Sequence, residues 1–416
     1  MKNNSLNLWN LIALLIVFFV KSAVSAEHNH QAMIKKSAKA TCEGHDITCA
    51  KTVTSAFAPN GDLWRVWALQ EKMYYQISVD NGQTFLAAQQ VNIPAEKISA
   101  RNENRPKIAF DQFQGVYLSW AMPLEKKYTA NIRFSYSKDY GKTFSTPITV
   151  NNDNLLTGHS FNELLVRDNG EVNIVWLDSR LSYQLKKQGK KTNGSSLYFA
   201  TANPRAGEAI FSNQSLANGT CVCCRIAMDY NKQGELAIFW RHIYEDNIRE
   251  FALLTLGKDG EGEKPSSNAV IQISYDHWKI NGCPHQGGGI SIDQENRYHL
   301  VWFNQGDKGK GIFYASSTDQ GKTLTPPLSV GDLQAQAAHP HVRQNNNVVD
   351  IVWTQFNGVE HQLWHQQSQD NGATFKKAKP VAKASSGSDR PFIIKQGDKN
   401  YVSWQRPKQG HWFKAL

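Results

Sequence analysis

Short apolar segments recur along the chain, and in seven places such a segment and a turn are followed by a strand-like run that ends in tryptophan. The first two of these runs are residues 63–67 and 116–120. The tryptophans are Trp67, Trp120, Trp176, Trp240, Trp302, Trp353 and Trp404, spaced by 53, 56, 64, 62, 51 and 51 residues. A near-constant period of this length predicts a repeat architecture in which each repeat is one supersecondary unit.

The content of the repeats favours sheets over helices. Aromatic residues make up 11% of the 416 residues, and aromatic side chains are enriched in strands. Alternating strands separated by Gly and Asn turns predict a β-propeller of seven four-stranded blades, an all-β fold. Because the tryptophans hold equivalent positions, we expect them to pack as wedges between blades rather than to stack on a ligand.

A second signature lies between the tryptophans. Four segments share the pattern Ser-x-Asp-x-Gly-x-Thr followed by Phe or Leu, at residues 78–85, 137–144, 317–324 and 368–375. In a tight hairpin the Asp can accept hydrogen bonds from amides of its own turn, and Gly can adopt the positive φ that the turn needs. The final Phe or Leu would anchor the turn between strands.

These turns resemble the Asp boxes (bacterial neuraminidase repeats) of the sialidase superfamily, and the resemblance covers nearly all of the chain after residue 26. It implies a propeller fold. Residues 201–211 and 254–263 depart from it because they lack the box. Sialidases are generally six-bladed, so six blades is the alternative to seven. Three strands are visible in the last repeat, and we expect a strand near residues 36–42 to complete its blade and close the ring.

The N-terminus has the pattern of a secretion signal. Lys2 is followed by an apolar stretch at residues 11–20 and by small residues at 23–26 that fit a cleavage site. The stretch is shorter than the roughly 20 residues that span a bilayer, which disfavours a membrane anchor. We therefore expect a signal peptide over residues 1–26 and a single propeller domain over 27–416, without a membrane span and either periplasmic or secreted.

Charge adds little to this picture. Removing the signal lowers the net charge from +10 to +8, because Lys2 and Lys21 leave without any acidic residue. The other basic residues are scattered, as at residues 126–127 and 187–191, so a solvated surface explains them and we expect no nucleic-acid partner. A mild preference for anionic ligands stays open.

Residues that could bind a metal ion or take part in catalysis lie shortly before the repeat tryptophans. In a propeller the first strand of each blade lines the central channel, so residues about 12 to 19 positions before each tryptophan should converge at one end. They are Cys49, Arg105, His159, Cys221, Cys223, Cys224, Arg225, Cys283, His285, His339, His341, Asp389 and Arg390.

Three pairs in this set, at 221/223, 283/285 and 339/341, are spaced so that their side chains share a face on extended backbone. Paired thiols and imidazoles predict a transition-metal site, with copper as Cu(I) or zinc as the candidate ion. The predicted ligands are Cys221, Cys223, Cys283, His285, His339 and His341.

Disulfides are the competing interpretation, because an exported protein with six cysteines usually oxidises them. Cys42 and Cys49 are close enough in sequence to form a local bridge. For Cys221, Cys223, Cys224 and Cys283 the choice between structural disulfides and a metal site stays open.

The resemblance also implies an enzyme alternative, a sialidase-like glycoside hydrolase acting on anionic sugars or another glycan. Sialidases hold a substrate carboxylate with three arginines and use a Tyr nucleophile with an Asp acid/base. Residues 105–108 (Arg-Pro-Lys-Ile) are similar to the Arg-Ile-Pro motif of the family with the order changed. The candidates are Arg105, Arg225, Arg390, Asp178 and Tyr275, although no full set matches position by position. A non-catalytic protein-binding scaffold is the third possibility.

Overall fold

The computed structural model describes residues 45–257, 270–385 and 387–416. The predicted signal peptide, Cys42 and the predicted ring-closing strand near residues 36–42 lie outside these residues. The described residues belong to one compact unit that spans Glu43–Leu416.

The strands pair into small antiparallel sheets in chain order. The first sheet contains β1 (Thr54–Phe57), β2 (Leu63–Leu69), β3 (Lys72–Ser78) and β4 (Gln89–Gln90). The second contains β5 (Lys107–Phe110), β6 (Val116–Pro123), β7 (Ala130–Ser137) and β8 (Ile148–Thr149). A short 3-10 helix at Ile47–Cys49 precedes β1.

The middle of the chain forms one eight-stranded sheet made of two halves. The first half contains β9 (His159–Val166), β10 (Val172–Asp178), β11 (Ser195–Ala202) and β12 (Ser212–Thr220), with α1 (Arg180–Lys187) between β10 and β11. The second contains β13 (Ala227–Tyr230), β14 (Leu236–Ile243), β15 (Arg249–Leu256) and β16 (Ile271–Gln272), with a 3-10 turn at Glu245–Asn247. The halves join through one residue pair, Thr220 of β12 and His242 of β14.

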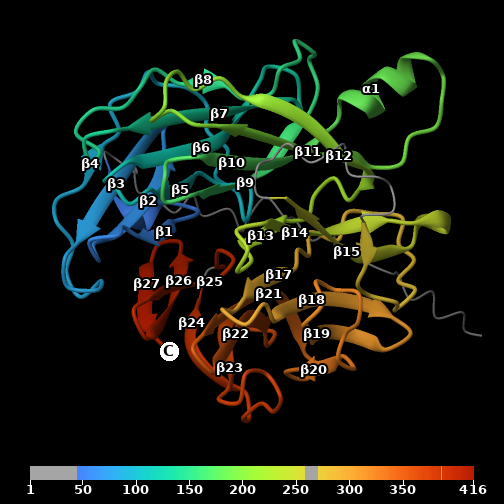
Figure 1. Cartoon of the computed structure of the whole chain (residues 1–416). Helices are drawn as coiled ribbons and strands as arrows, with labels where there is room; N and C mark the ends of the chain where they lie inside the picture. The colour runs from blue at the N-terminus through green and yellow to red at the C-terminus, as the bar shows by residue number, and fades with distance from the viewer. Residues whose placement is uncertain (1–44, 258–269, 386) are drawn as a thin grey trace, which may run out of the picture. The chain divides into compact units, whose positions relative to one another are not determined.

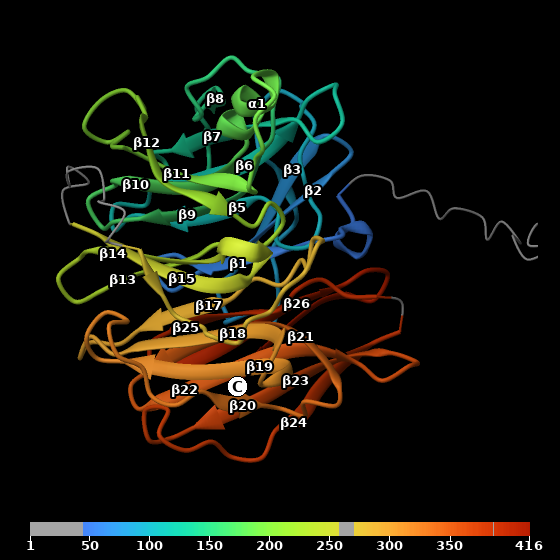
Figure 2. The same ribbon diagram turned by 90° about the vertical axis from the view of Figure 1, so that its right-hand side faces the viewer.

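The C-terminal part repeats the pattern of the first two sheets. One sheet contains β17 (Gly289–Ile292), β18 (Tyr298–Gly306), β19 (Gly309–Ser317) and β20 (Leu328–Val330). The next contains β21 (Gln336–Asn345), β22 (Val348–Phe356), β23 (His361–Ser368) and β24 (Lys379–Ala384). The last described strands are β25 (Phe392–Gln396), β26 (Lys399–Arg406) and β27 (Gly410–Ala415). Figure 2 shows the chain descending from the β9–β12 half through β13–β16 to β17–β20.

The first strand of each group packs against the first strand of the next. β1 contacts β5, β5 contacts β9, and the series continues through β13, β17 and β21 to β25. β25 in turn contacts β1, so the red C-terminal strands return beside the blue N-terminal ones (Figure 1). The arrangement is all-β and propeller-like, as the repeat pattern predicts.

The seven repeat tryptophans are buried, with 0–1% of each exposed, and each lies in the second strand of its group. Trp302 of β18 shares a hydrophobic cluster with Phe239 and Phe251 from the preceding group, so it packs between sheets. The expectation of wedge-like core residues is confirmed. The expectation that the tryptophan ends its strand is wrong, because β18 continues to Gly306 to pair with the next strand.

Each Asp-box turn joins the third and fourth strands of a sheet, as in the turn between β3 and β4. There Asp80 accepts hydrogen bonds from the Thr84 amide (2.8 Å) and hydroxyl (2.6 Å), and Ser78 Oγ accepts from the Gly82 amide (2.8 Å). The same bonds recur around Asp139, Asp319 and Asp370. Gly82 has a φ of 84°, which confirms the predicted need for glycine.

In the described part of the chain, no helix combines the length and apolarity that crossing a membrane requires.

Candidate functional site: the thiol and imidazole cluster

Segments ahead of the first strands meet at one end of these strands. The amide of Phe161 in β9 donates to Asn104, which lies ahead of β5 (3.0 Å). The amide of His339 in β21 donates to Gln286, which lies ahead of β17 (3.0 Å). Residues far apart in sequence therefore share this end, as the offsets from the tryptophans predict.

Arg225 crosses this end from its place ahead of β13. Its guanidinium donates to the Gly288 carbonyl (3.0 Å) and the Pro340 carbonyl (2.8 Å). It also forms an ion pair with Glu103, which lies ahead of β5 (3.2 Å), and both side chains are buried. One side chain thereby links four segments. The repeat analysis missed Glu103, since an acidic residue two positions before Arg105 carries no distinctive pattern.

Arg105 and Asp389 form a second buried ion pair at this end. Arg105 also donates to the carbonyls of Val53 (3.2 Å) and Arg390 (3.0 Å). Burial raises the pKa of Asp389 to about 6 despite the opposing effect of the Arg105 charge. Arg105 and Asp389 therefore make their hydrogen bonds to other groups of the protein.

Cys223, Cys283 and His285 come together between two of these segments. A ligand atom from each, two Sγ and one ring nitrogen, lies within 4.8 Å of the others. Cys223 is buried, whereas Cys283 and His285 are exposed, so the group opens to solvent. His285 has a φ of 52°, a conformation that non-glycine residues seldom adopt and that often marks a functional position.

Two further thiols lie behind Cys223. Cys221 Sγ is 3.7 Å from Cys223 Sγ and 3.1 Å from Cys224 Sγ, and all three side chains are buried. Cys221, Cys223, Cys224 and Cys283 are free thiols, so the disulfides considered for them are not present. The bridge between Cys42 and Cys49 stays a prediction, because Cys42 lies outside the described residues.

The electrostatics of the cluster favour one thiolate. Hydrogen bonds from Cys223 and Cys224 lower the pKa of Cys221, and the nearby Arg241 charge acts in the same direction. The Arg249 guanidinium lies 3.6 Å from Cys221 Sγ. The thiols of Cys223 and Cys224 have raised pKa values, chiefly from the Cys221 contact in the first case and from burial in the second. The directions of these shifts make Cys221 the most readily deprotonated of the three buried thiols.

The predicted ligands His339 and His341 differ in their surroundings. His339 is 5% exposed, has a φ of 58°, and its Nδ1 has no hydrogen-bond partner among the described residues. Nearby charges on Arg390, Arg225 and His285 reinforce the effect of burial, which lowers the pKa of His339. His341 instead accepts a hydrogen bond at Nδ1 from the Ile393 amide (3.3 Å). Of these two histidines, His339 is the one whose Nδ1 has no hydrogen-bond partner among the described residues.

The remaining enzyme candidates are not assembled in the same way. Asp178 is fully buried and accepts hydrogen bonds from Arg180 (2.8 Å) and Trp176 (2.9 Å). It forms a separate group with Asp153 and His159, whose ligand atoms lie within 4.8 Å of one another. Tyr275 is 57% exposed and donates to the Gln272 carbonyl (3.2 Å). Asp153 was missed because it precedes His159 by six residues in no recognisable motif.

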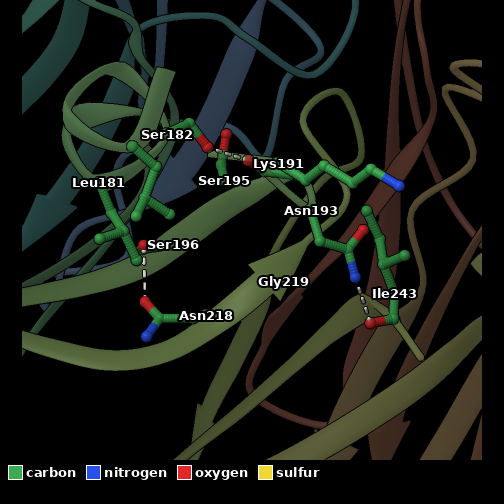
Figure 3. Close-up of a pocket in the computed structure, with 11 residues that line it drawn as sticks. Leu181, Ser182, Lys191, Asn193, Ser195, Ser196, Asn218, Gly219 and Ile243 are labelled. Carbon is green, nitrogen blue, oxygen red and sulfur yellow. Dashed lines mark hydrogen bonds between the residues drawn. The ribbon is translucent and has the colours of Figure 1, made fainter. Parts of the chain in front are cut away.

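A pocket of about 360 Å³ lies beside the thiol segment. Figure 3 shows its lining: Leu181 and Ser182 from α1, with Asn218 and Gly219 from the end of β12. Gly219 stands two residues before Cys221. One wall is held by a hydrogen bond from the Ser196 hydroxyl to the Asn218 side-chain oxygen (2.8 Å).

No protein-family model matches the chain, and no curated protein is similar to it in sequence. Solved structures are similar in fold. The BP39L lectin from Burkholderia pseudomallei has 9% identity and a TM-score of 0.60, over 89% of this chain and 96% of the lectin.

Two polysaccharide lyases are similar as well. The PL25 ulvan lyase bound to -[GlcA(1-4)Rha3S]- has 12% identity and a TM-score of 0.56, over 90% of this chain and 96% of the lyase. The lyase Uly1 has 10% identity and a TM-score of 0.51, over 87% and 88%. At these identities the likeness shows the fold, an all-β, propeller-like architecture that carbohydrate-binding and carbohydrate-cleaving proteins also use.

Proposed function

We propose that the segments ahead of β13 and β17 bind one soft transition-metal ion, copper as Cu(I) or zinc. The observation that carries this proposal is the gathering of Cys223, Cys283 and His285 ligand atoms within 4.8 Å of one another. Metal–thiolate bonds of about 2.3 Å in tetrahedral geometry place neighbouring sulfur atoms roughly 3.8 Å apart. The three ligand atoms therefore need only small movements to share an ion.

Further donors lie beside this group. Cys221 Sγ is 3.7 Å from Cys223 Sγ, a spacing that suits two thiolates on one ion. Among the described residues, the His339 Nδ1 is a buried imidazole nitrogen without a hydrogen-bond partner, and burial lowers its pKa, which favours the neutral form that metals bind. Thiolates and imidazoles are the donors that select copper and zinc over magnesium or calcium.

The glycoside hydrolase alternative has less support. A sialidase-like site needs arginines that are free to hold a substrate carboxylate with both arms of the guanidinium. Arg105 and Arg225 donate instead to carbonyls of the chain and pair with Asp389 and Glu103. A carboxylate ligand would have to displace these buried partners, which costs free energy.

We also infer that the sheets are seven blades of a closed propeller. The support is the cyclic contact of β1, β5, β9, β13, β17, β21 and β25, together with one buried repeat tryptophan per group. If the N-terminal segment directs export, as the sequence predicts, the clustered thiols meet an oxidising compartment. A bound metal would then protect them from disulfide formation.

The test is the metal content of the full chain, purified without oxygen and loaded with Cu(I) or zinc. We expect one equivalent per chain by elemental mass spectrometry. Cys223→Ser combined with Cys283→Ser should lower retention at least tenfold. His277→Gln is the matched control: His277 is exposed in the same connection and pairs with Asp307 (2.8 Å).

The fold should survive the cysteine changes, because these side chains contribute little to a large core. Unchanged thermal unfolding of the metal-free variants checks this. A wild-type chain that holds neither metal after loading, or a double variant that retains it, would overturn the proposal.

A further inference from the structure

The opposite ends of four first strands surround a second, larger pocket. Its volume is about 760 Å³, and it is lined from the C-terminal ends of β13, β17, β21 and β25. Asn371 of the fourth Asp box also lines it. Because the thiol segments precede β13 and β17, this pocket and the proposed metal site lie at opposite ends of the same strands.

The lining is almost entirely polar. Small-molecule pockets are usually lined by hydrophobic side chains, but here Tyr230 and Ile292 are the only large apolar groups. Seven lining side chains carry amides: Asn231, Gln294, Gln344, Asn345, Asn346, Asn347 and Asn371. An amide can donate and accept at once, which matches the paired donor and acceptor capacity of sugar hydroxyls.

The charges in the pocket leave one cation without a counter-ion. Arg343 lies 3.4 Å from Asp229, and the Arg343 Nε is buried without a hydrogen-bond partner in the described residues. Lys395 is exposed and, over the same residues, its ammonium has no ion pair or hydrogen bond. Partial desolvation and the Arg343 charge lower the pKa of Lys395, while the Asp229 charge opposes them. Two cations therefore face one carboxylate.

The other charged lining groups do not supply the missing anion. Asp293 is 6% exposed and is committed to the backbone amides of Glu295 and Arg297 and to Asn371 (2.8–2.9 Å). Glu295 and Lys232 are exposed at the rim and opposite in charge. Arg343 and Lys395 thus remain the two cations beside the single carboxylate of Asp229.

We propose that this pocket binds a carboxylated saccharide, with the uronate carboxylate between Arg343 and Lys395 and the hydroxyls on the surrounding amides. A guanidinium donates two parallel hydrogen bonds to a carboxylate, and an ammonium adds a point charge. Asn346 and Asn347 are exposed and open to hydroxyl groups. The volume lies within the range of small-molecule sites, about 300–1,000 Å³.

The experiment is calorimetric titration of the full chain with a glucuronate-containing disaccharide and with its neutral counterpart, in which the carboxylate is reduced to the alcohol. We expect the charged disaccharide to bind at least tenfold more tightly. Lys395→Met should remove most of that preference, and Arg343→Gln should weaken binding of the charged sugar at least tenfold. Lys399→Met is the control, since Lys399 is exposed on β26 outside the pocket.

Thermal unfolding of Arg343→Gln shows whether the loss of its Asp229 contact disturbs the fold, and Lys395→Met keeps the test independent of that contact. Cys223→Ser with Cys283→Ser should bind the disaccharide normally, which separates this site from the metal proposal. Equal affinity for the two disaccharides, no binding of either, or an unchanged preference in Lys395→Met would overturn the inference.

Discussion

The first two Asp-box sheets and the unboxed β9–β12 half differ in how the chain leaves them. In the first two boxed sheets the fourth strand is two residues long, β4 and β8, and a loop carries the chain to the next group. In the unboxed β9–β12 half the fourth strand has nine residues and runs to Thr220, where it pairs with β14. The thiol segment begins at the next residue. In this half the long fourth strand delivers Cys221 to the site, whereas the other unboxed half ends in the two-residue β16.

The hydrophobic core does not follow this division. Trp353 of a boxed sheet and Trp240 of an unboxed half are both 0–1% exposed. We expect Trp353→Ala and Trp240→Ala each to lower the free energy of unfolding by about 3–5 kcal/mol, because each removes a large buried side chain. Urea unfolding with an unchanged slope measures this. A much smaller cost for Trp240→Ala would mean that the unboxed halves are a separately and weakly folded unit.

Glycine substitutions in the turns should distinguish sheets with an Asp box from those without one more clearly than the tryptophan substitutions do. Gly372 in the fourth Asp box has a φ of 85°, and an added Cβ would overlap the Tyr314 hydroxyl. Gly372→Ala should therefore cost more than about 1 kcal/mol in the free energy of unfolding. Gly207, in the unboxed connection after β11, meets nothing within 4 Å. Gly207→Ala should be neutral or stabilise by about 0.4–1 kcal/mol. Equal costs for the two would contradict the comparison.

The smallest effect should appear in how the free energy of unfolding depends on pH. Hydrogen bonds from the Thr of the same turn lower the pKa of Asp80, Asp139, Asp319 and Asp370 to about 2. A lowered pKa gives stability that is complete above the unfolded value near 4 and lost as the pH falls through 2. Replacing all four with Asn should flatten the unfolding free energy between pH 4 and 2. The four carboxylates are exposed, so salt should weaken the effect. If the variant and the wild type showed the same dependence of unfolding free energy on pH, these four carboxylates would not stabilise the fold as proposed.

Local patterns predicted much of this fold from the sequence. The tryptophan period and the Ser-x-Asp-x-Gly-x-Thr turns are contacts within one repeat, so spacing alone identifies them. The positions of Cys223, Cys283 and His285 followed from a shared offset ahead of the first strands, and the structure brings these three together.

The sequence patterns did not predict which residues of different repeats contact one another. The ion pair of Arg225 with Glu103 joins residues 122 positions apart, and neither residue carries a motif that names its partner. His341 shares the spacing of a ligand pair, yet its Nδ1 is used by the Ile393 amide. The register shift between Ala338 and His341 breaks the alternation on which the pair was predicted. The larger polar pocket depends on the ends of four separate strands, so no single segment of the sequence predicts it.

Arg225 ties together the segments that meet at the thiol end of the first strands. Its side chain joins Glu103 to the carbonyls of Gly288 and Pro340, all buried, and it can swing aside only by breaking these bonds together. The proposed thiol site and the polar pocket therefore lie at opposite ends of strands whose entry segments Arg225 holds together. A thiophilic ion and a hydroxylated anion could occupy the same molecule at once without exchanging ligands, each exposed to the solvent on its own side.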